Sequence, residues 1–267
     1  RQRQMCIRDS TILNHIGSDK TLIVISAMGK TTNSLELVVK NYFDNKEELQ
    51  YSLNEVFSFH NKILEDLFID NKHQIFSDVK EVFENLRIFL KRNKSPDYSF
   101  VYDQVVIFGE ILSTKIINSY LNHSNIKCNW VDARILIKTD SKYRDANLNW
   151  ETTKNSIFNN INTKLLNITQ GFIASDSNNF STTLGREGSD YSAAIFAYCL
   201  NAESVTIWKD VPGVLNADPR VFKKPQLLNK ISYTEAIELA FYGASVIHPK
   251  TLQPCLLYTS PSPRDEV

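Results

Sequence analysis

Apolar and polar residues follow two different periods along the chain, and each period predicts a different kind of element. Residues 21–27 (TLIVISA) form a short, continuous and mostly β-branched run, which is typical of a strand buried in a parallel sheet. Farther along, apolar residues recur every three or four positions, which predicts two amphipathic helices over 53–68 and 75–90. Pro96 interrupts this pattern, and a third helical stretch is expected over 98–122.

The alternation of strands and helices continues beyond this point. A polar loop, 28–33, follows the first strand, and Ser34 is expected to cap the next helix. Ser232 and Glu235 form a capping box that opens a helix ended by Gly243. The remaining predicted elements are a strand and its exit over 130–136, strands over 168–174 and 204–208, and helices over 150–166 and 189–200. Such alternation predicts an α/β sandwich with a largely parallel sheet.

Three polar loops come directly after predicted strands, at 28–33, 175–190 and 209–220. In parallel sheets, ligands bind beyond the carboxyl ends of the strands. We therefore expect these three loops to form one shared site.

The second of these loops carries the most informative motif, TTLGREGSDYSAA at 182–194. Gly185 and Gly188 allow backbone N–H groups to approach a ligand closely. The helix that follows adds unpaired N–H donors and the positive end of its dipole. Arg186 adds a planar cation suited to a carboxylate or a phosphate. The motif therefore indicates an anion-binding turn.

This turn and the segment IWKDVPGVLNADPR at 207–220 occur in an order and spacing that resemble the aspartokinase family. Shorter segments support the resemblance, which covers about 12–254: SAMGKTTN at 26–33, FGEILST at 108–114 and FYGASVIHP at 241–249. It implies a three-layer αβα sandwich with a mainly parallel central sheet, the amino-acid kinase fold. It also implies ATP-dependent phosphorylation of the side-chain carboxylate of L-aspartate to 4-phospho-L-aspartate, the entry to lysine, threonine and methionine, with Mg²⁺ arriving on the nucleotide.

The resemblance assigns the amino-acid substrate to residues in three of the segments. Thr32 would hold a substrate carboxylate, although it and Asn33 also suit a simple cap or turn. Glu110, flanked by apolar residues, would pair with the substrate ammonium; the alternative is a surface glutamate paired with Lys115. Arg186 would bind a carboxylate. The full predicted set is Ser26, Thr32, Glu110, Arg186, Gly188, Ser189 and Asp190.

The nucleotide would lie on the third loop and on the last motif. The predicted residues are Lys209, Asp210, Asp218, Arg220 and Ser245. Family members often have threonine at the position of Lys209 and lysine at that of Ser245, so Ser245 would supply only a hydroxyl or backbone contact. His248 is interpreted as a turn or core histidine, because a carboxylate nucleophile needs no general base.

Both ends of the chain depart from the family pattern. Residues 1–10 (RQRQMCIRDS) and 255–267 (CLLYTSPSPRDEV) resemble translated sequencing-adapter sequence; the alternative is genuine disordered termini. We expect an amino-acid kinase catalytic domain over 11–254 that lacks the family's first strand and its lysine–glycine loop, and no C-terminal regulatory domains. Without that lysine we assign no catalytic residue, and we expect little activity and poor solubility.

Composition narrows the class of protein further. Lys+Arg and Asp+Glu number 30 each, which argues against a general nucleic-acid or anionic-membrane binder. No apolar run reaches the roughly 20 residues that span a bilayer. The cysteines are scattered without metal-ligand spacing, so we expect a cytoplasmic protein without a structural metal. The parent enzyme would be a homo-oligomer. Two alternatives stay open: a sister kinase acting on glutamate, acetylglutamate or a nucleoside monophosphate, and a non-catalytic fragment that binds an amino acid or a partner subunit.

Overall fold

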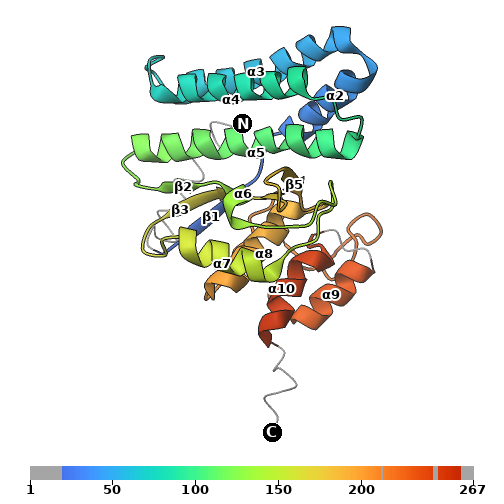
Figure 1. The fold of residues 1–267 in the computed structure, drawn as a ribbon. Coiled ribbons are helices and arrows are strands. Elements are labelled where there is room, and N and C mark those ends of the chain that lie inside the picture. Colours follow the sequence, from blue (N-terminus) through green and yellow to red (C-terminus); the bar gives the residue numbers. More distant parts are fainter. Residues whose placement is uncertain (1–19, 212, 243–245, 260–267) are drawn as a thin grey trace.

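The computed structural model describes residues 20–211, 213–242 and 246–259 (Figure 1). The expected foreign segment at 1–10 lies outside this range, as does most of the one at 255–267. Within the described part, no helix is both long enough and apolar enough to cross a membrane.

A parallel sheet lies at the centre of the molecule. β3 (Asn167–Gln170) is flanked by β1 (Leu22–Ile25) on one side and β2 (Asn129–Val131) on the other. Ile168 of β3 lies opposite both Ile23 and Trp130, so the three strands end at a common edge. All four residues of β3 are buried, as expected for the middle strand of a sheet covered on both faces.

Helices cover both faces of this sheet. α5 (Tyr98–His123) packs on one face, and α8 (Gly188–Leu200) contacts β1 from the other, with α7 (Trp150–Asn160) beside it (Figure 1). The prediction of an α/β sandwich with a mainly parallel sheet is confirmed. α5 is apolar nearly all round because it is buried between the sheet and a further layer of helices.

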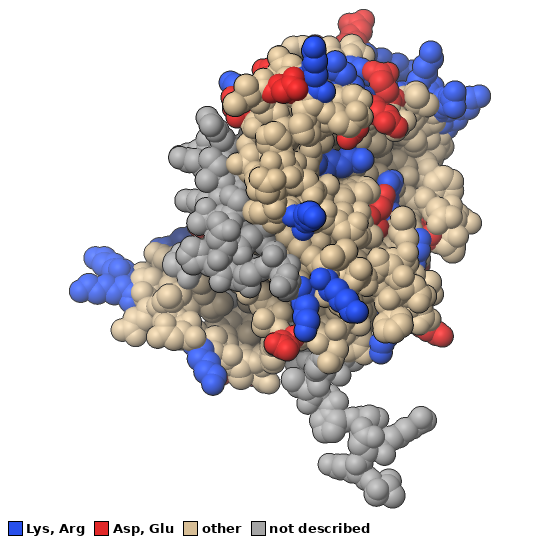
Figure 2. Space-filling view, turned by 90° about the vertical axis from the view of Figure 1, so that its left-hand side faces the viewer, with Lys and Arg blue, Asp and Glu red and all other residues tan. Residues whose placement is uncertain are grey.

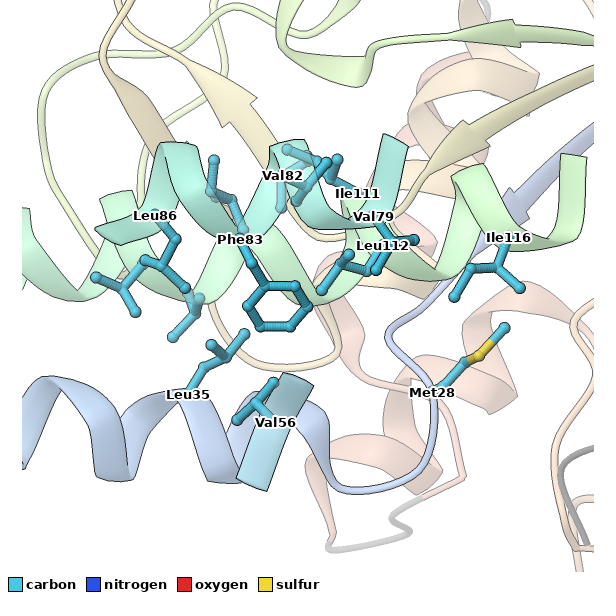
Figure 3. Packing of buried hydrophobic residues seen from close by; sticks show 14 of the residues in the cluster. Met28, Leu35, Val56, Val79, Val82, Phe83, Leu86, Ile111, Leu112 and Ile116 are labelled. Carbon is cyan, nitrogen blue, oxygen red and sulfur yellow. The ribbon is translucent and has the colours of Figure 1, made fainter. Parts of the chain in front are cut away.

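That further layer is the helical cap, which consists of α2 (Thr31–Asp44), α3 (Lys46–Leu67) and α4 (Gln74–Arg92). The two predicted amphipathic helices correspond to α3 and α4. Phe83 of α4 points toward Leu35 and Val56 in a closely packed apolar interior (Figure 3). On the face shown in Figure 2, charged side chains of both signs gather over the outer helices at the top.

The predicted strand at 168–174 is wrong as a single element. The chain leaves the parallel sheet at Phe172, whose φ of 70° is left-handed. It then forms β4 (Ile173–Ser175), which pairs antiparallel with β5 (Ser181–Thr183). The apolar run at 168–174 therefore contributes one strand to each of two sheets. A single left-handed residue redirects the backbone between them without changing the hydrophobic pattern.

Other predicted elements also differ in the structure. No described strand pairs with 204–208, where Val205 and Trp208 are exposed, because strand propensity alone forms no strand without a neighbour. In the segment 130–136, predicted as a strand and its exit, the strand ends at Val131 and the exit forms the short helix α6 (Ala133–Leu136), which Asp132 caps. α7 stops at Asn160, ahead of a turn at Asn162. α2 begins at Thr31, so Ser34 lies inside it and is not its cap.

Near the C-terminal end, two helices follow a long irregular segment. Ser232 and Glu235 form the predicted capping box at the start of α9 (Tyr233–Phe241). Gly243, the expected end of this helix, lies outside the described residues. α10 (Pro249–Thr259) then packs against α8 and α9.

Candidate functional site

The predicted site residues approach one another at the carboxyl edge of β1 and β3. The carbonyl of Ile25 accepts the N–H of Gly171 at 2.9 Å. Gly171 in turn packs so closely on α8 that an added Cβ would lie 2.8 Å from the Cα of Ser189. Only glycine permits this approach. The loop after β1, which carries Ser26, is therefore a near neighbour of the start of α8.

Helix α5 closes the same edge from the other face of the sheet. The hydroxyl of Ser113 donates to the carbonyl of Ser26 at 2.7 Å, and Gly109 packs against Ala27 and Thr31. Thr32 is half-buried in the first turn of α2. The structure thus brings the first predicted segment against the glycine–glutamate segment of α5.

Glu110 is the most unusual ionisable group of this edge. Its side chain is only 2% exposed, and its Oε2 has no hydrogen-bond partner in the described part of the chain. Burial raises its pKa to about 8, against the opposing effect of hydrogen bonds from its own N–H and that of Ala27. The alternative of a surface glutamate paired with Lys115 is wrong, since the Lys115 ammonium lies 4.8 Å from the Trp130 ring centroid. A buried carboxyl with a vacant acceptor suits an incoming cationic group.

The glycine turn presents an unpaired cation. α8 begins at Gly188 without a side-chain cap, so the N–H groups of its first turn are not used by a capping side chain. Arg186 is exposed, and no hydrogen bond or ion pair engages its side chain within the described ranges. Gly185 supports the turn with a φ of 79°. The N–H of Gly188 donates to the carbonyl of Gly185 at 3.1 Å, but an uncapped helix start beside an unpaired guanidinium still suits a carboxylate or a phosphate.

Lys209 joins the third predicted loop to this turn. Its ammonium lies 2.9 Å from Oε2 of Glu187 and 2.8 Å from Oδ2 of Asp190. Burial lowers the pKa of Lys209, but hydrogen bonds to Asp190 and Glu187 outweigh burial and raise it overall. Asp210 is exposed next to it. Lys209 and Asp210 therefore lie at the rim of the glycine turn, although they do not follow a strand as predicted.

The rest of the predicted nucleotide set is less well placed. Arg220 is 83% exposed and forms a two-pronged ion pair with Asp218, at 2.7 Å for its shortest contact. No hydrogen bond or ion pair of the described residues links this pair to the glycine turn. Ser245 lies outside the described residues. His248 accepts the N–H of Lys250 through Nδ1 at 3.2 Å, which agrees with its interpretation as a turn histidine.

Two further side chains that fasten the turn are absent from the sequence predictions. The ammonium of Lys250, at the start of α10, donates to the carbonyl of Leu184 at 3.0 Å and to Asp145 at 2.8 Å. Lys250 directly follows the last motif, at 241–249, so an extension of that motif by one residue would have included it. For Asp145 we find no signal in the sequence.

Asp103 is a third residue missing from the predictions. Its carboxylate accepts the N–H of Arg144, the N–H of Thr183 and the hydroxyl of Thr183, all within 2.9 Å. Burial raises its pKa to about 6, while these hydrogen bonds lower it. The signal was available, since Asp103, like Glu110, is a carboxylate within an apolar helical stretch. Asp103 ties α5 to β5 and thereby holds the strand that leads into the glycine turn.

Comparison of the chain with known proteins identifies its family. The model of the amino acid kinase family matches residues 10–258. The chain belongs to the amino acid kinase family. Among described residues of this family member, no group of three or more His, Cys, Asp or Glu side chains could hold a metal ion.

Its similar proteins are aspartokinases. Lysine-sensitive aspartokinase 3 of Escherichia coli is 33% identical over 241 residues, which cover 88% of this chain and 52% of that protein. Bifunctional aspartokinase/homoserine dehydrogenase 2 of Arabidopsis thaliana, a chloroplastic protein, is 32% identical over 91% of this chain and 27% of its own length. The chain thus spans between about a quarter and a half of these two amino acid kinase relatives.

Solved structures agree with the sequence comparison. E. coli aspartokinase III in complex with aspartate and ADP matches with a TM-score of 0.84 and 30% identity, over 94% of this chain and 56% of that one. The same enzyme in complex with lysine and aspartate matches with a TM-score of 0.82. The fold that the resemblance implied is therefore confirmed for this amino acid kinase.

Proposed function

We propose that this chain is part of an aspartate kinase, an enzyme that binds L-aspartate and ATP and phosphorylates the aspartate side-chain carboxylate, and that it binds both substrates with little catalytic activity of its own. The observation that carries the proposal is that a buried carboxyl acceptor and an unpaired cation occur at one edge of the sheet. Glu110 offers a buried acceptor to an ammonium group, and Arg186 offers an unpaired cation to a carboxylate. An amino acid with an acidic side chain needs both. The similar solved structures that hold aspartate, one of them with ADP, support the same substrates.

In this proposal, each side chain of the edge has a distinct task. Glu110 binds the substrate ammonium, and Arg186 binds a carboxylate through two parallel N–H bonds. The hydroxyl of Thr32 and the backbone around Ser26 orient the substrate from the other side. Ser189 and Asp190 lie within the first turn of α8, where Ser189 offers its N–H to the ligand, while the carboxylate of Asp190 is paired with Lys209.

The reaction itself asks little of the protein beyond positioning. A carboxylate is already a nucleophile at neutral pH, so no general base is needed for its attack on the γ-phosphorus of ATP. The uncapped start of α8 and Arg186 fit an anionic group. Lys209, which directly precedes the loop with Asp210, Asp218 and Arg220, contacts Glu187 and Asp190 next to them. Mg²⁺ bound to the nucleotide would neutralise charge on the phosphates.

The test is the formation of acyl phosphate from Mg-ATP, trapped with hydroxylamine, alongside equilibrium binding of labelled L-aspartate or L-glutamate. We expect aspartate to bind in preference to glutamate and to be the acceptor. Arg186→Lys should weaken aspartate binding by at least about tenfold, because lysine cannot form the two-pronged contact. Arg87→Lys, a surface change on α4, is the matched control and should have no effect.

Other outcomes would favour other functions. A preference for glutamate would assign the chain to a sister amino-acid kinase. Aspartate binding without acyl phosphate would favour a non-catalytic amino-acid-binding fragment. Failure of a folded chain to bind either amino acid would refute the proposal. The cytoplasmic location and the homo-oligomeric parent expected from the sequence stay predictions.

A further inference from the structure

Lys209 is partly enclosed although it belongs to an exposed loop. Its side chain is 22% exposed, while most residues between 201 and 211 are exposed. Two carboxylates, those of Glu187 and Asp190, lie within 2.9 Å of its ammonium. These contacts occupy the cation that the sequence assigned to the nucleotide.

One of the two carboxylates occupies an unusual position. Glu187 has a φ of 54° and a ψ of 30°, a left-handed conformation that favours glycine over a residue with a side chain. It stands at the position that precedes α8, yet its side chain does not cap the helix. Its carboxylate is instead paired with Lys209. The strained position and the ion pair occur together.

The charges of the glycine turn show what this pairing achieves. Residues 185–190 contain one cation, Arg186, and two carboxylates, Glu187 and Asp190. Their sum is −1, and Lys209 brings it to zero. Without Lys209, the turn would repel a carboxylate or a phosphate at the place where Arg186 and the start of α8 attract one.

We propose that Lys209 is a positioning residue that serves this site as an internal counter-ion and tether. Its ammonium cancels the charge of Glu187 and Asp190, which leaves Arg186 free for the anionic ligand, and it fastens the loop that begins at 209 to the start of α8. This role rests on the proposed binding of L-aspartate. It differs from the direct nucleotide contact expected from the sequence, because Lys209 acts on the ligand through two carboxylates.

The two roles predict different results when Glu187 is neutralised. Lys209→Met should weaken L-aspartate binding by about tenfold, the effect of one uncompensated charge near a partly exposed ligand. Adding Glu187→Gln to the same chain should restore most of this affinity, and Lys209→Arg should retain it. The loss should also be smaller at 0.5 M salt than at 0.05 M salt, since salt screens exposed charges.

A direct phosphate contact would give the contrary pattern. Lys209→Met would then weaken Mg-ADP binding but not aspartate binding, and Glu187→Gln would rescue neither; that result would overturn the counter-ion role. Lys230→Met, elsewhere on the same irregular segment, is the control for losing a lysine and should leave aspartate affinity unchanged.

The tether is measured without any ligand. Limited proteolysis within 209–220 should be accelerated several-fold by Lys209→Met and not by Lys230→Met, because the ion pairs hold this loop against α8. Equal cleavage rates would refute the tether. If the unaltered chain binds no aspartate, the proposed function fails and the counter-ion role with it, whereas proteolysis still decides the tether.

Discussion

The helical cap and the polar edge of the sheet are stabilised in different ways. In the cap, Phe83, Val56 and Leu35 meet in an apolar interior, and Nδ1 of the buried His60 hydrogen-bonds to the carbonyl of Val56 at 2.8 Å. At the edge, charged side chains bond to backbone: Asp103 accepts N–H groups of two segments, and Lys250 donates to a carbonyl. The stability of the cap should therefore depend mainly on the volume of its buried side chains, and that of the edge on the charges of its side chains.

Buried ionisable groups show the same contrast. Burial lowers the pKa of His60 to about 4 and raises that of Glu110 to about 8, so both are mainly neutral at pH 7. His60 lies among aromatic rings, between Phe59 and Phe83. Glu110 lies at the carboxyl edge of the sheet, and its Oε2 has no hydrogen-bond partner among the described residues. Only the second group is placed where an incoming cation could change its charge state.

The largest effect is expected from the cap. Phe83→Ala removes a fully buried ring at the contact of α4 with α2 and α3, and should lower the free energy of unfolding by about 3–5 kcal/mol. Urea denaturation measures this. Phe158→Ala, which changes a ring that is 80% exposed on α7, should cost less than about 0.5 kcal/mol. Equal effects would mean that the cap interior is not packed as described.

A smaller loss should follow a change of charge at the edge. Asp103→Ala leaves the N–H groups of Arg144 and Thr183 without their acceptor, which should cost about 2–4 kcal/mol. Hydrogen exchange should also increase at β5, which Asp103 holds. Asp218→Ala removes an exposed carboxylate and serves as the control. If Asp103→Ala matched this control, the buried hydrogen bonds would not support the glycine turn.

Glu110 should make stability depend on pH with a defined sign. Its folded pKa of about 8 exceeds the unfolded value of 4.5, so above pH 4.5 the unfolded chain releases a proton that the folded chain retains. The free energy of unfolding should therefore fall as the pH rises from about 4.5 to 8.

Glu110→Gln removes this group from the titration. The difference between variant and parent should grow in favour of the variant by roughly 3–4 kcal/mol from pH 5 to pH 8, as measured by urea denaturation at each pH. His60 contributes equally to both chains and cancels. A difference that stays constant with pH would show that Glu110 titrates normally.

The contrast between the apolar cap and the polar edge also explains how much of each region could be predicted from the sequence. Helical periodicity predicted α3 and α4, because a helix with one buried face has apolar residues at every third or fourth position. The capping box at Ser232 could also be predicted, because it depends on residues only three positions apart in the sequence. The run at 168–174 gave a wrong result, since the left-handed Phe172 leaves no trace in hydrophobicity.

The candidate site was predictable only where it depends on a recognisable motif. Glu110 and the glycine turn were found that way. The ion pairs of Lys209 with Glu187 and of Lys250 with Asp145 join residues 22 and 105 positions apart, and no local pattern encodes such partners. The segment at 204–208 has the composition of a strand, but its exposure depends on which strands lie beside it.

The central claim is that Glu110 and Arg186 form the two ends of one aspartate site. We would test it by titrating the chain and its Glu110→Gln variant with L-aspartate and with succinate, which lacks the amine. Glu110→Gln should weaken aspartate binding at least about tenfold and leave succinate binding unchanged, because only aspartate carries the ammonium that Glu110 is proposed to bind. Equal binding of aspartate by both chains, or an equal loss for both ligands, would contradict the claim.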